Sequence, residues 1–283
     1  MQTTLVGKLP HIHARGTVAG IYWTFVLALA PLAAMALAAW GWNALFLLVV
    51  SCVGAVAAEV LAAAALGKPR RLSDGVSVLT AMTFACMCPP SLDLRLAFGG
   101  SFLAVFFGKE MFGGTGQYLF HPACLGQALM RACFPESFEA LSGGGRNFDG
   151  LSLLLAPQAD VLAGVSVVAL AAGSALLLFK KTVEWAVPAI ALLLCSFYNF
   201  LAPGAAFSWA ESLFFAMFLI TDFPPAPWSK RGRWFFAGMA AFLAVFLRGG
   251  TGGGFVFPFA VLGANALSPW IDRGLQPFRL QRT

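Results

Sequence analysis

The chain has 283 residues, of which 59% are hydrophobic and only 11% are charged, with 28 phenylalanines and a net charge of +6. This composition is far more apolar than that of soluble globular proteins, and apolar stretches long enough to cross about 30 Å of hydrocarbon recur along the chain. A sizeable soluble domain is therefore excluded. The sequence predicts an integral membrane protein whose positive charge lies in loops rather than on a nucleic-acid surface.

The N-terminal segment carries Lys8, His11, His13 and Arg15 and leads into an apolar stretch without a convincing small-residue cleavage site. We expect this stretch to stay as a first membrane helix rather than to be removed as a signal peptide. The six cysteines fall mostly within predicted spans, which argues against a disulfide framework.

Ten spans are predicted along the chain, with boundaries uncertain by several residues. They lie at 19–39, 44–66, 75–89, 95–108, 115–133, 160–179, 184–201, 208–222, 234–247 and 253–270. Alternate loops then hold fourteen of the eighteen Lys and Arg residues, with Lys109 counted among them, and the remaining loops hold four. Because basic loops stay in the cytoplasm, both termini are predicted to be cytoplasmic.

One motif occurs twice and divides the chain into two halves. Gly-Gly-Thr-Gly at 113–116 and again at 249–252 lies nine residues before a proline and follows the same run, Phe-Leu-Ala-Val-Phe. Because each half has five spans, an odd number, the two copies should enter the membrane from opposite sides. We therefore predict an all-helical membrane fold of two inverted five-helix repeats with broken helices.

This prediction divides the chain into five parts. They are residues 1–18, a cytoplasmic segment; 19–133, the first repeat; 134–159, an outer, periplasmic loop; 160–270, the second repeat; and 271–283, a cytoplasmic tail.

The glycine motif is neither a dinucleotide fingerprint nor a phosphate-binding P-loop, because the strand and the Gly-Lys-Ser/Thr that these require are missing. Two uses remain open. The glycines can let helices pack tightly, as small residues do in membranes, or they can present backbone amides at a broken helix.

Few ionisable residues fall inside the predicted spans. A carboxylate at bilayer centre costs at least about 2.5–3.5 kcal/mol, so Glu59, deep in the second span, has a strong claim to function. Asp74 and Asp222 lie at the ends of two short spans that close with Pro-Pro pairs, where they either cap helix ends or contact a ligand. No metal site is predicted, since Cys86 and Cys88 are more simply buried thiols.

Taken together, five stretches resemble the D subunit of Rnf-type ion-translocating electron-transport complexes and its homologue, the B subunit of sodium-pumping NADH:quinone reductase. The matching stretches cover nearly the whole chain. They are Pro10–His13, Ser73–Gly75 through Thr80 to Pro90, Phe112–Gly126, Thr221–Pro224 and Asn265–Arg273. The resemblance implies a ten-helix, urea-transporter-like bundle in a bacterial inner membrane, carrying electrons between NADH and ferredoxin or quinone with coupled Na⁺ or H⁺ movement.

Two departures from the family pattern bear on the cofactor. The family's outer loop usually carries Asp-Gly-x-Ser-Gly-Ala-Thr, whose threonine holds FMN through a phosphoester. Here Leu155 stands at the threonine position, and Ser152 is the nearby hydroxyl. Covalent FMN is therefore not expected. His121 replaces the asparagine that precedes Pro122 in the family.

The resemblance implies a flavin, FMN or riboflavin, which we expect to bind noncovalently. The implied cofactor-binding residues are Asp74, Thr80, Gly113, Gly114, Thr115, Gly116, His121, Pro122, Ser152, Thr221, Asp222, Gly249 and Gly250. The ion-pathway candidates are Glu59, Asp74 and Asp222. The implied partners are the lipid bilayer and the other subunits of the complex, including a periplasm-facing flavoprotein and iron–sulfur subunits, with no nucleic acid. A flavin-free ion pathway or scaffold, and a urea-transporter-like solute channel, remain as alternatives.

Overall fold

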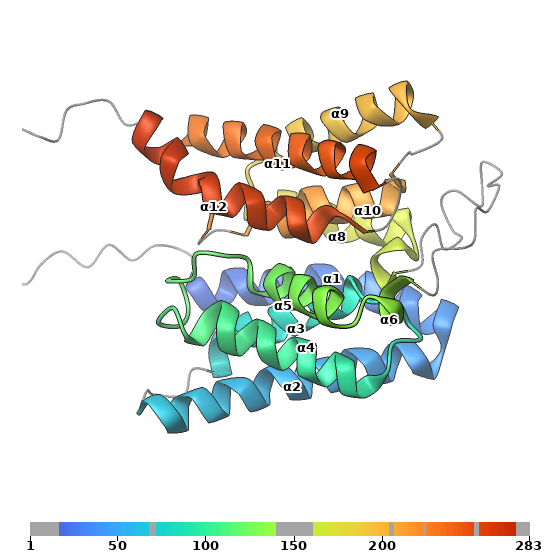
Figure 1. Cartoon of the computed structure of the whole chain (residues 1–283), viewed down its shortest axis with the longest axis vertical. Coiled ribbons are helices and arrows are strands. Elements are labelled where there is room, and N and C mark those ends of the chain that lie inside the picture. The colour runs from blue at the N-terminus through green and yellow to red at the C-terminus, as the bar shows by residue number, and fades with distance from the viewer. Residues whose placement is uncertain are drawn as a thin grey trace, which may run out of the picture.

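The computed structural model describes residues 17–67, 72–139, 161–203, 207–222, 225–251 and 255–275. Within these ranges every regular element is a helix (Figure 1). The prediction of an all-helical fold is confirmed. Each of the ten predicted spans overlaps a helix in the described parts of the chain, although the helices of the fifth and sixth spans begin only at Pro122 and Val167.

The first half runs from α1 to α6, and the second half from η3 to α12. The elements of the first half are α1 (Val18–Trp40), α2 (Trp42–Leu66), η1 (Leu72–Asp74), α3 (Val76–Cys86), α4 (Leu94–Val105), the π-helix η2 (Phe106–Glu110), α5 (Pro122–Cys133) and α6 (Glu136–Glu139). Those of the second half are η3 (Leu162–Gly164), α8 (Val167–Phe179), α9 (Ala186–Leu201), α10 (Trp209–Phe214), the π-helix η5 (Phe215–Leu219), α11 (Lys230–Thr251) and α12 (Phe257–Leu275).

Local sequence signals fix many helix ends. Thr17, Asp93, Ser166 and Ser208 each precede a helix and accept a hydrogen bond from a backbone amide of its first turn. These side chains satisfy amides that have no partner inside the helix. Between α1 and α2 the chain turns at Gly41, whose φ of 60° favours glycine.

Two helices, Val18–Trp40 and Trp42–Ala65, are long and apolar enough to cross a membrane, and four shorter helices are also apolar. The outer surface agrees with a lipid environment. On α9 the large apolar side chains of Leu193, Phe197, Phe200 and Leu201 are all more than 60% exposed and recur at the spacing of one helix face. An apolar face of this extent is unsuited to water, which supports the predicted membrane location.

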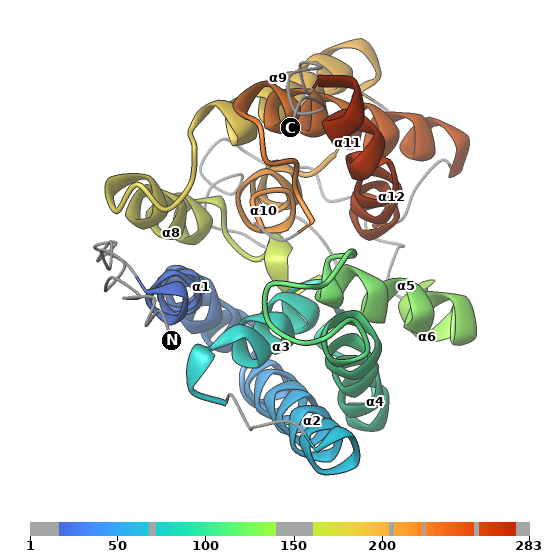
Figure 2. The ribbon, with the colours of Figure 1, turned by 90° about the vertical axis from the view of Figure 1, so that its left-hand side faces the viewer.

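The helices form two groups with α10 between them (Figure 2). One group holds α1 to α5, and the other holds α9, α11 and α12, while α1 packs against α8 and α5 packs against α12. At the α1–α8 contact a Cβ atom added to Gly173 would lie 2.0 Å from the carbonyl oxygen of Ala28. Close backbone approach through small residues is the usual way that membrane helices pack.

Two sequence predictions need correction. The first Gly-Gly-Thr-Gly lies in a loop ahead of α5. In the second copy, Gly249, Gly250 and Thr251 belong to α11. The two copies therefore do not interrupt a helix at the same position, contrary to the prediction from the repeat. Lys109 does not belong to a loop at all. It lies in the π-helix η2 and is 1% exposed, because it pairs with buried carboxylates.

Candidate functional site

The two glycine motifs lie at opposite ends of the central helix formed by α10 and η5. Near the first copy, the hydroxyl oxygen of Tyr118 is 3.2 Å from a carboxylate oxygen of Asp222, which follows η5. Beside the second copy, the Arg248 guanidinium lies over the ring of Phe207, which precedes α10, at 5.4 Å. The structure therefore does not bring Gly249 and Gly250 to the residues around the first copy.

A group of polar side chains from both halves lies at the Asp222 end of the central helix, and we call it the Tyr–Asp site. It comprises Tyr22, Asp74, Thr115, Tyr118, His121 and Asp222. The two tyrosine hydroxyls are 3.2 Å apart, and Tyr118 contacts both oxygens of Asp222. An ionised carboxylate only accepts hydrogen bonds, so Tyr118 donates to Asp222 and Tyr22 donates to Tyr118.

Asp74 holds two parts of this site together. Its Oδ1 accepts a hydrogen bond from the amide of Val76 at 3.0 Å, which caps the start of α3 as one reading of the sequence anticipated. Its Oδ2 accepts a hydrogen bond from the hydroxyl of Thr115. One carboxylate thereby fixes the first glycine motif against the beginning of α3.

The backbone around the first motif is held by the preceding π-helix. Gly113, Gly114 and Gly116 have φ angles of 116°, 100° and 86°, a region that favours glycine. The amides of Gly113 and Gly114 donate to the carbonyl oxygens of Glu110 and Lys109 at 3.2 and 3.1 Å. These two amides already donate to backbone carbonyl oxygens, so they are not free to bind a ligand. The sequence interpretation in which the motif presents exposed amides at a broken helix therefore does not apply to them.

His121 stands directly before α5, with Pro122 at the helix start. The Nδ1 atom accepts a hydrogen bond from the amide of Cys124 at 3.4 Å. In a neutral imidazole the proton is then on Nε2, which lies 3.7 Å from an Asp222 carboxylate oxygen. The histidine that replaces the family's asparagine therefore caps α5 and faces the Tyr–Asp site.

A pocket opens against the Tyr–Asp site between α1, α3 and η5. Its apolar walls include Phe25 and Phe218, whose rings meet edge to face at 6.3 Å. The polar lining groups are the side chains of Tyr22, Thr80, Thr83, Tyr118, His121 and Asp222. Of the cofactor residues expected from the sequence, the structure places Thr80, His121 and Asp222 on this pocket.

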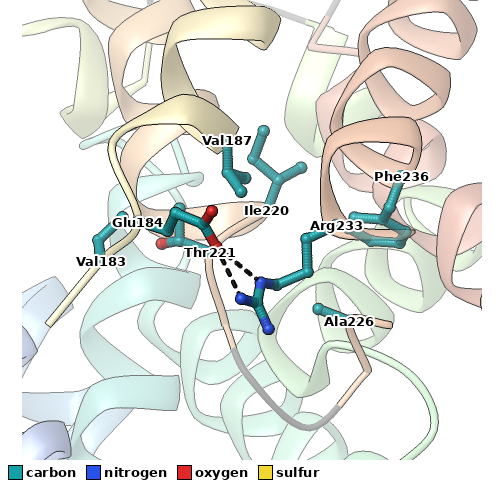
Figure 3. Close-up of a pocket in the computed structure, with 8 residues that line it drawn as sticks. All are labelled: Val183, Glu184, Val187, Ile220, Thr221, Ala226, Arg233 and Phe236. Atoms are coloured by element: carbon teal, nitrogen blue, oxygen red, sulfur yellow. Dashed lines mark hydrogen bonds and ion pairs between the residues drawn. The ribbon is translucent and has the colours of Figure 1, made fainter. Parts of the chain in front are cut away.

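A second pocket is lined by residues that include Ile220, Thr221 and Phe236 (Figure 3). Thr221 lines it, and its hydroxyl donates to the carbonyl oxygen of Met217 at 2.6 Å. At the pocket's edge the Arg233 guanidinium donates two hydrogen bonds to one oxygen of Glu184, at 2.7 and 3.1 Å. Partial burial favours the neutral acid, but the bonds from Arg233 and Trp234 outweigh it and lower the pKa of Glu184.

A separate cluster of charged side chains is buried beside α2, and we call it the lysine cluster. It comprises Glu59, Ser77, Lys109 and Glu110. The Lys109 ammonium lies 3.2 Å from Glu59, 3.1 Å from the Ser77 hydroxyl and 3.4 Å from Glu110. The Ser77 hydroxyl also donates to Glu59. Of the expected ion-pathway residues, Glu59 belongs to this cluster, while Asp74 and Asp222 belong to the Tyr–Asp site.

Sequence reasoning missed Tyr22, Tyr118 and Lys109. The chain holds only three tyrosines, and two of them meet at the Tyr–Asp site, so their rarity in so apolar a sequence was a usable signal. Lys109 was counted as a loop residue because a charge count cannot distinguish an interfacial lysine from a buried, paired one. Ser152 and Leu155 lie outside the described residues.

Comparison with known proteins gives the same family that the sequence motifs indicated. The model of the NQR2, RnfD, RnfE family matches residues 5–281. The D subunit of an ion-translocating oxidoreductase complex from Methanosarcina acetivorans is 29% identical over 96% of this chain and 95% of its own length. The D subunit of the proton-translocating ferredoxin:NAD(+) oxidoreductase complex of Clostridium ljungdahlii is 25% identical, with coverage of 97% and 95%. Its counterpart in the Na(+)-translocating complex of Acetobacterium woodii is 26% identical, with coverage of 95% and 92%. The chain belongs to the NQR2, RnfD, RnfE family.

Proposed function

We propose that the chain is the membrane subunit of an Rnf-type ion-translocating NADH:ferredoxin oxidoreductase complex, where it carries electrons through a noncovalent flavin and couples them to Na⁺ or H⁺ movement. Membership of the family over residues 5–281 carries this proposal. The subunit acts within the complex and is not catalytic alone. Its partners are a periplasm-facing flavoprotein and iron–sulfur subunits.

The fold proposed for this function is a pair of inverted five-helix repeats in the bacterial inner membrane, with both termini in the cytoplasm. The positions of the two glycine motifs support it, because Tyr118, beside the first motif, and Arg248, beside the second, contact residues at opposite ends of the central α10–η5 helix. Inverted repeats commonly place a site between their halves, and the hydrogen bond from Tyr118 to Asp222 joins the halves here.

The lining of the pocket at the Tyr–Asp site supports the flavin proposal by its chemistry, but the pocket has room for no more than a water molecule in this structure and would have to widen to admit the ring. Phe25 and Phe218 supply apolar walls, and Thr80, Thr83 and His121 supply hydrogen-bonding groups. Cofactor sites are typically apolar with a few placed polar groups of this kind. A bound flavin would accept and release electrons, while Thr80 and His121 would orient its polar edge and Asp222 would hold Tyr118 in place.

Glu59, Asp74 and Asp222 are the proposed contacts for the coupling ion. Glu59 is 3% exposed, and a carboxylate is rarely retained at such a position without a functional reason. Moving one charge through 100 mV is worth about 2.3 kcal/mol, so an ion gradient of ordinary size can drive electrons from NADH towards ferredoxin.

Two measurements test the proposal. This subunit, purified away from its flavoprotein partner, should release flavin into the supernatant on acid denaturation, while its band shows no fluorescence on a denaturing gel. Flavin bound covalently to the band would contradict the noncovalent attachment, and its absence from both fractions would favour the flavin-free pathway or scaffold. Glu59→Gln, Asp74→Asn and Asp222→Asn should weaken ion-dependent electron transfer. Unchanged coupling in all three variants would reject the ion contacts.

A further inference from the structure

The lysine cluster has the geometry of a cation site that the protein fills with its own ammonium group. Three oxygen atoms, one each from Glu59, Ser77 and Glu110, lie 3.1–3.4 Å from Lys109 Nζ. An ammonium has three protons to donate, and each has an oxygen within reach here. Carboxylate and hydroxyl oxygens are also the ligands that bind hard metal cations.

The Lys109 ammonium is buried, so water would not readily take its place beside the two carboxylates. The side chains of Glu59, Lys109 and Glu110 are 3%, 1% and 9% exposed. An apolar cluster that includes Ala55, Ala58, Ala81 and Val105 packs on α2, α3 and α4 beside them. Removing one partner of such a buried pair leaves an uncompensated charge, which is strongly unfavourable.

The lysine is held at a fixed place in the chain. It lies in the π-helix η2, an element often found at functional sites, and its carbonyl oxygen accepts the hydrogen bond from Gly114. At Gly108, an added Cβ atom would lie 2.7 Å from Pro122 Cα, so η2 also lies tightly against the start of α5. The ammonium is thus positioned by the first glycine motif and by α5.

We propose that Lys109 is a tethered cation that occupies a monovalent-cation site formed by Glu59, Ser77 and Glu110, and that it keeps Na⁺ from binding there in the native chain. The inference rests on the proposed function and narrows it: while Lys109 occupies this site, Glu59 can contact H⁺ but not Na⁺, and a coupling Na⁺ is left to Asp74 and Asp222. Two carboxylates and one ammonium leave the cluster with a formal charge of −1, and removing the ammonium leaves −2. The vacated position would then attract a small cation strongly.

The test compares the native protein with Lys109→Met and Lys109→Ala, each purified within its complex, in NaCl and in choline chloride of equal ionic strength. Native protein should bind no Na⁺ at this site and show the same Tm in both salts. Lys109→Met should bind one additional Na⁺, with a saturable rise in Tm of about 5 °C at 100 times the dissociation constant. Lys109→Ala, which leaves more space, should also be stabilised by methylammonium.

The matched control is Glu59→Gln combined with Lys109→Met, which removes the charges of Glu59 and Lys109, leaves only that of Glu110, and should abolish the Na⁺ response. A folded Lys109→Met variant without a Na⁺ response would overturn the proposal, as would native protein that binds Na⁺ through Glu59. Failure of both single variants to fold in NaCl and in methylammonium would also count against it, because an open cation site should accept one of these ions. Flavin content is measured in the same samples, so loss of the proposed redox function is recognised separately.

Discussion

The phenol of Tyr118 donates a hydrogen bond to the carboxylate of Asp222, a residue 104 positions further along the chain. This bond connects the loop that contains the first glycine motif with the end of the central helix. Its two partners come from different halves of the sequence. The bond therefore couples the position of the glycine loop to that of α10 and η5.

The first prediction removes this bond. Tyr118→Phe leaves Asp222 without one donor and Tyr22 without its acceptor, and an unsatisfied buried polar group costs about 1–3 kcal/mol. We expect Tm in detergent to fall by several degrees and flavin retention to weaken. The matched control is Tyr198→Phe, whose ring lies 5.4 Å from Phe207 at the opposite end of α10. Equal effects of the two substitutions would contradict a special role for the Tyr118 hydroxyl.

A second prediction concerns the close packing of α4 against α3 and α5. A Cβ atom added to Gly100 would lie 2.3 Å from Phe84 Cζ and 2.7 Å from Met130 Cγ, and both neighbours are buried. Gly100→Ala should therefore destabilise the protein by about 1–3 kcal/mol through overpacking. The neighbouring Gly99 has nothing within 4 Å of an added Cβ, so Gly99→Ala should be neutral or slightly stabilising. Thermal unfolding of both variants measures this difference in stability. Equal stabilities would contradict the close packing of α4 against α3 and α5.

The third prediction is a pH dependence at the pocket of Figure 3. The pKa of Glu184 is lowered from its ordinary value of about 4.5, so its pair with Arg233 stabilises the fold above that value. This stability is lost as the pH falls through the lowered pKa. The pair is partly exposed and is worth at most about 1 kcal/mol. Glu184→Gln should accordingly lower Tm slightly at neutral pH.

Low pH and high salt provide the controls for Glu184→Gln. Below the lowered pKa, Glu184 is neutral in native protein too, so the difference in Tm from Glu184→Gln should shrink towards zero there. High salt at neutral pH should also reduce the difference, because salt screens partly exposed charges. A difference that grows on acidification would mean that the sign of the pKa shift is wrong.

Much of the helical framework was predictable because it follows from local signals. Apolar runs mark the spans, and Thr17, Asp93 and Gly41 mark their ends by capping or by a glycine conformation. The lysine cluster was not predictable in the same way. Its members lie at positions 59, 77, 109 and 110, and only the packing of α2, α3 and η2 brings them together.

The candidate site was predictable only in part, because packing rather than local sequence brings its residues together. The family motifs indicated Asp74, Thr115 and Asp222, and the structure bonds Asp74 to Thr115 and Asp222 to Tyr118. They did not indicate that Gly249 would lie at the far end of α10. The first three residues of the motif lie in a loop at Gly113–Thr115 and in a helix at Gly249–Thr251, so the local sequence alone does not decide between the two conformations.

This difference between the two motif copies gives the last prediction. Gly114 and Gly250 occupy the same place in the two copies, and an added Cβ atom would meet nothing within 4 Å at either. Gly114 has a φ of 100°, where a side chain costs about 1–3 kcal/mol of backbone strain. Gly250 is helical, and alanine there should gain about 0.5–1 kcal/mol.

Gly114→Ala should thus lower Tm and Gly250→Ala should raise it or leave it unchanged. Since neither change alters charge or causes a side-chain clash, opposite signs would isolate the backbone as the cause. The loop of the first copy also carries Thr115, so Gly114→Ala should weaken flavin retention while Gly250→Ala preserves it. Two variants of equal stability would mean that both copies share one conformation, and the assignment of the Tyr–Asp site to the first copy alone would then fail.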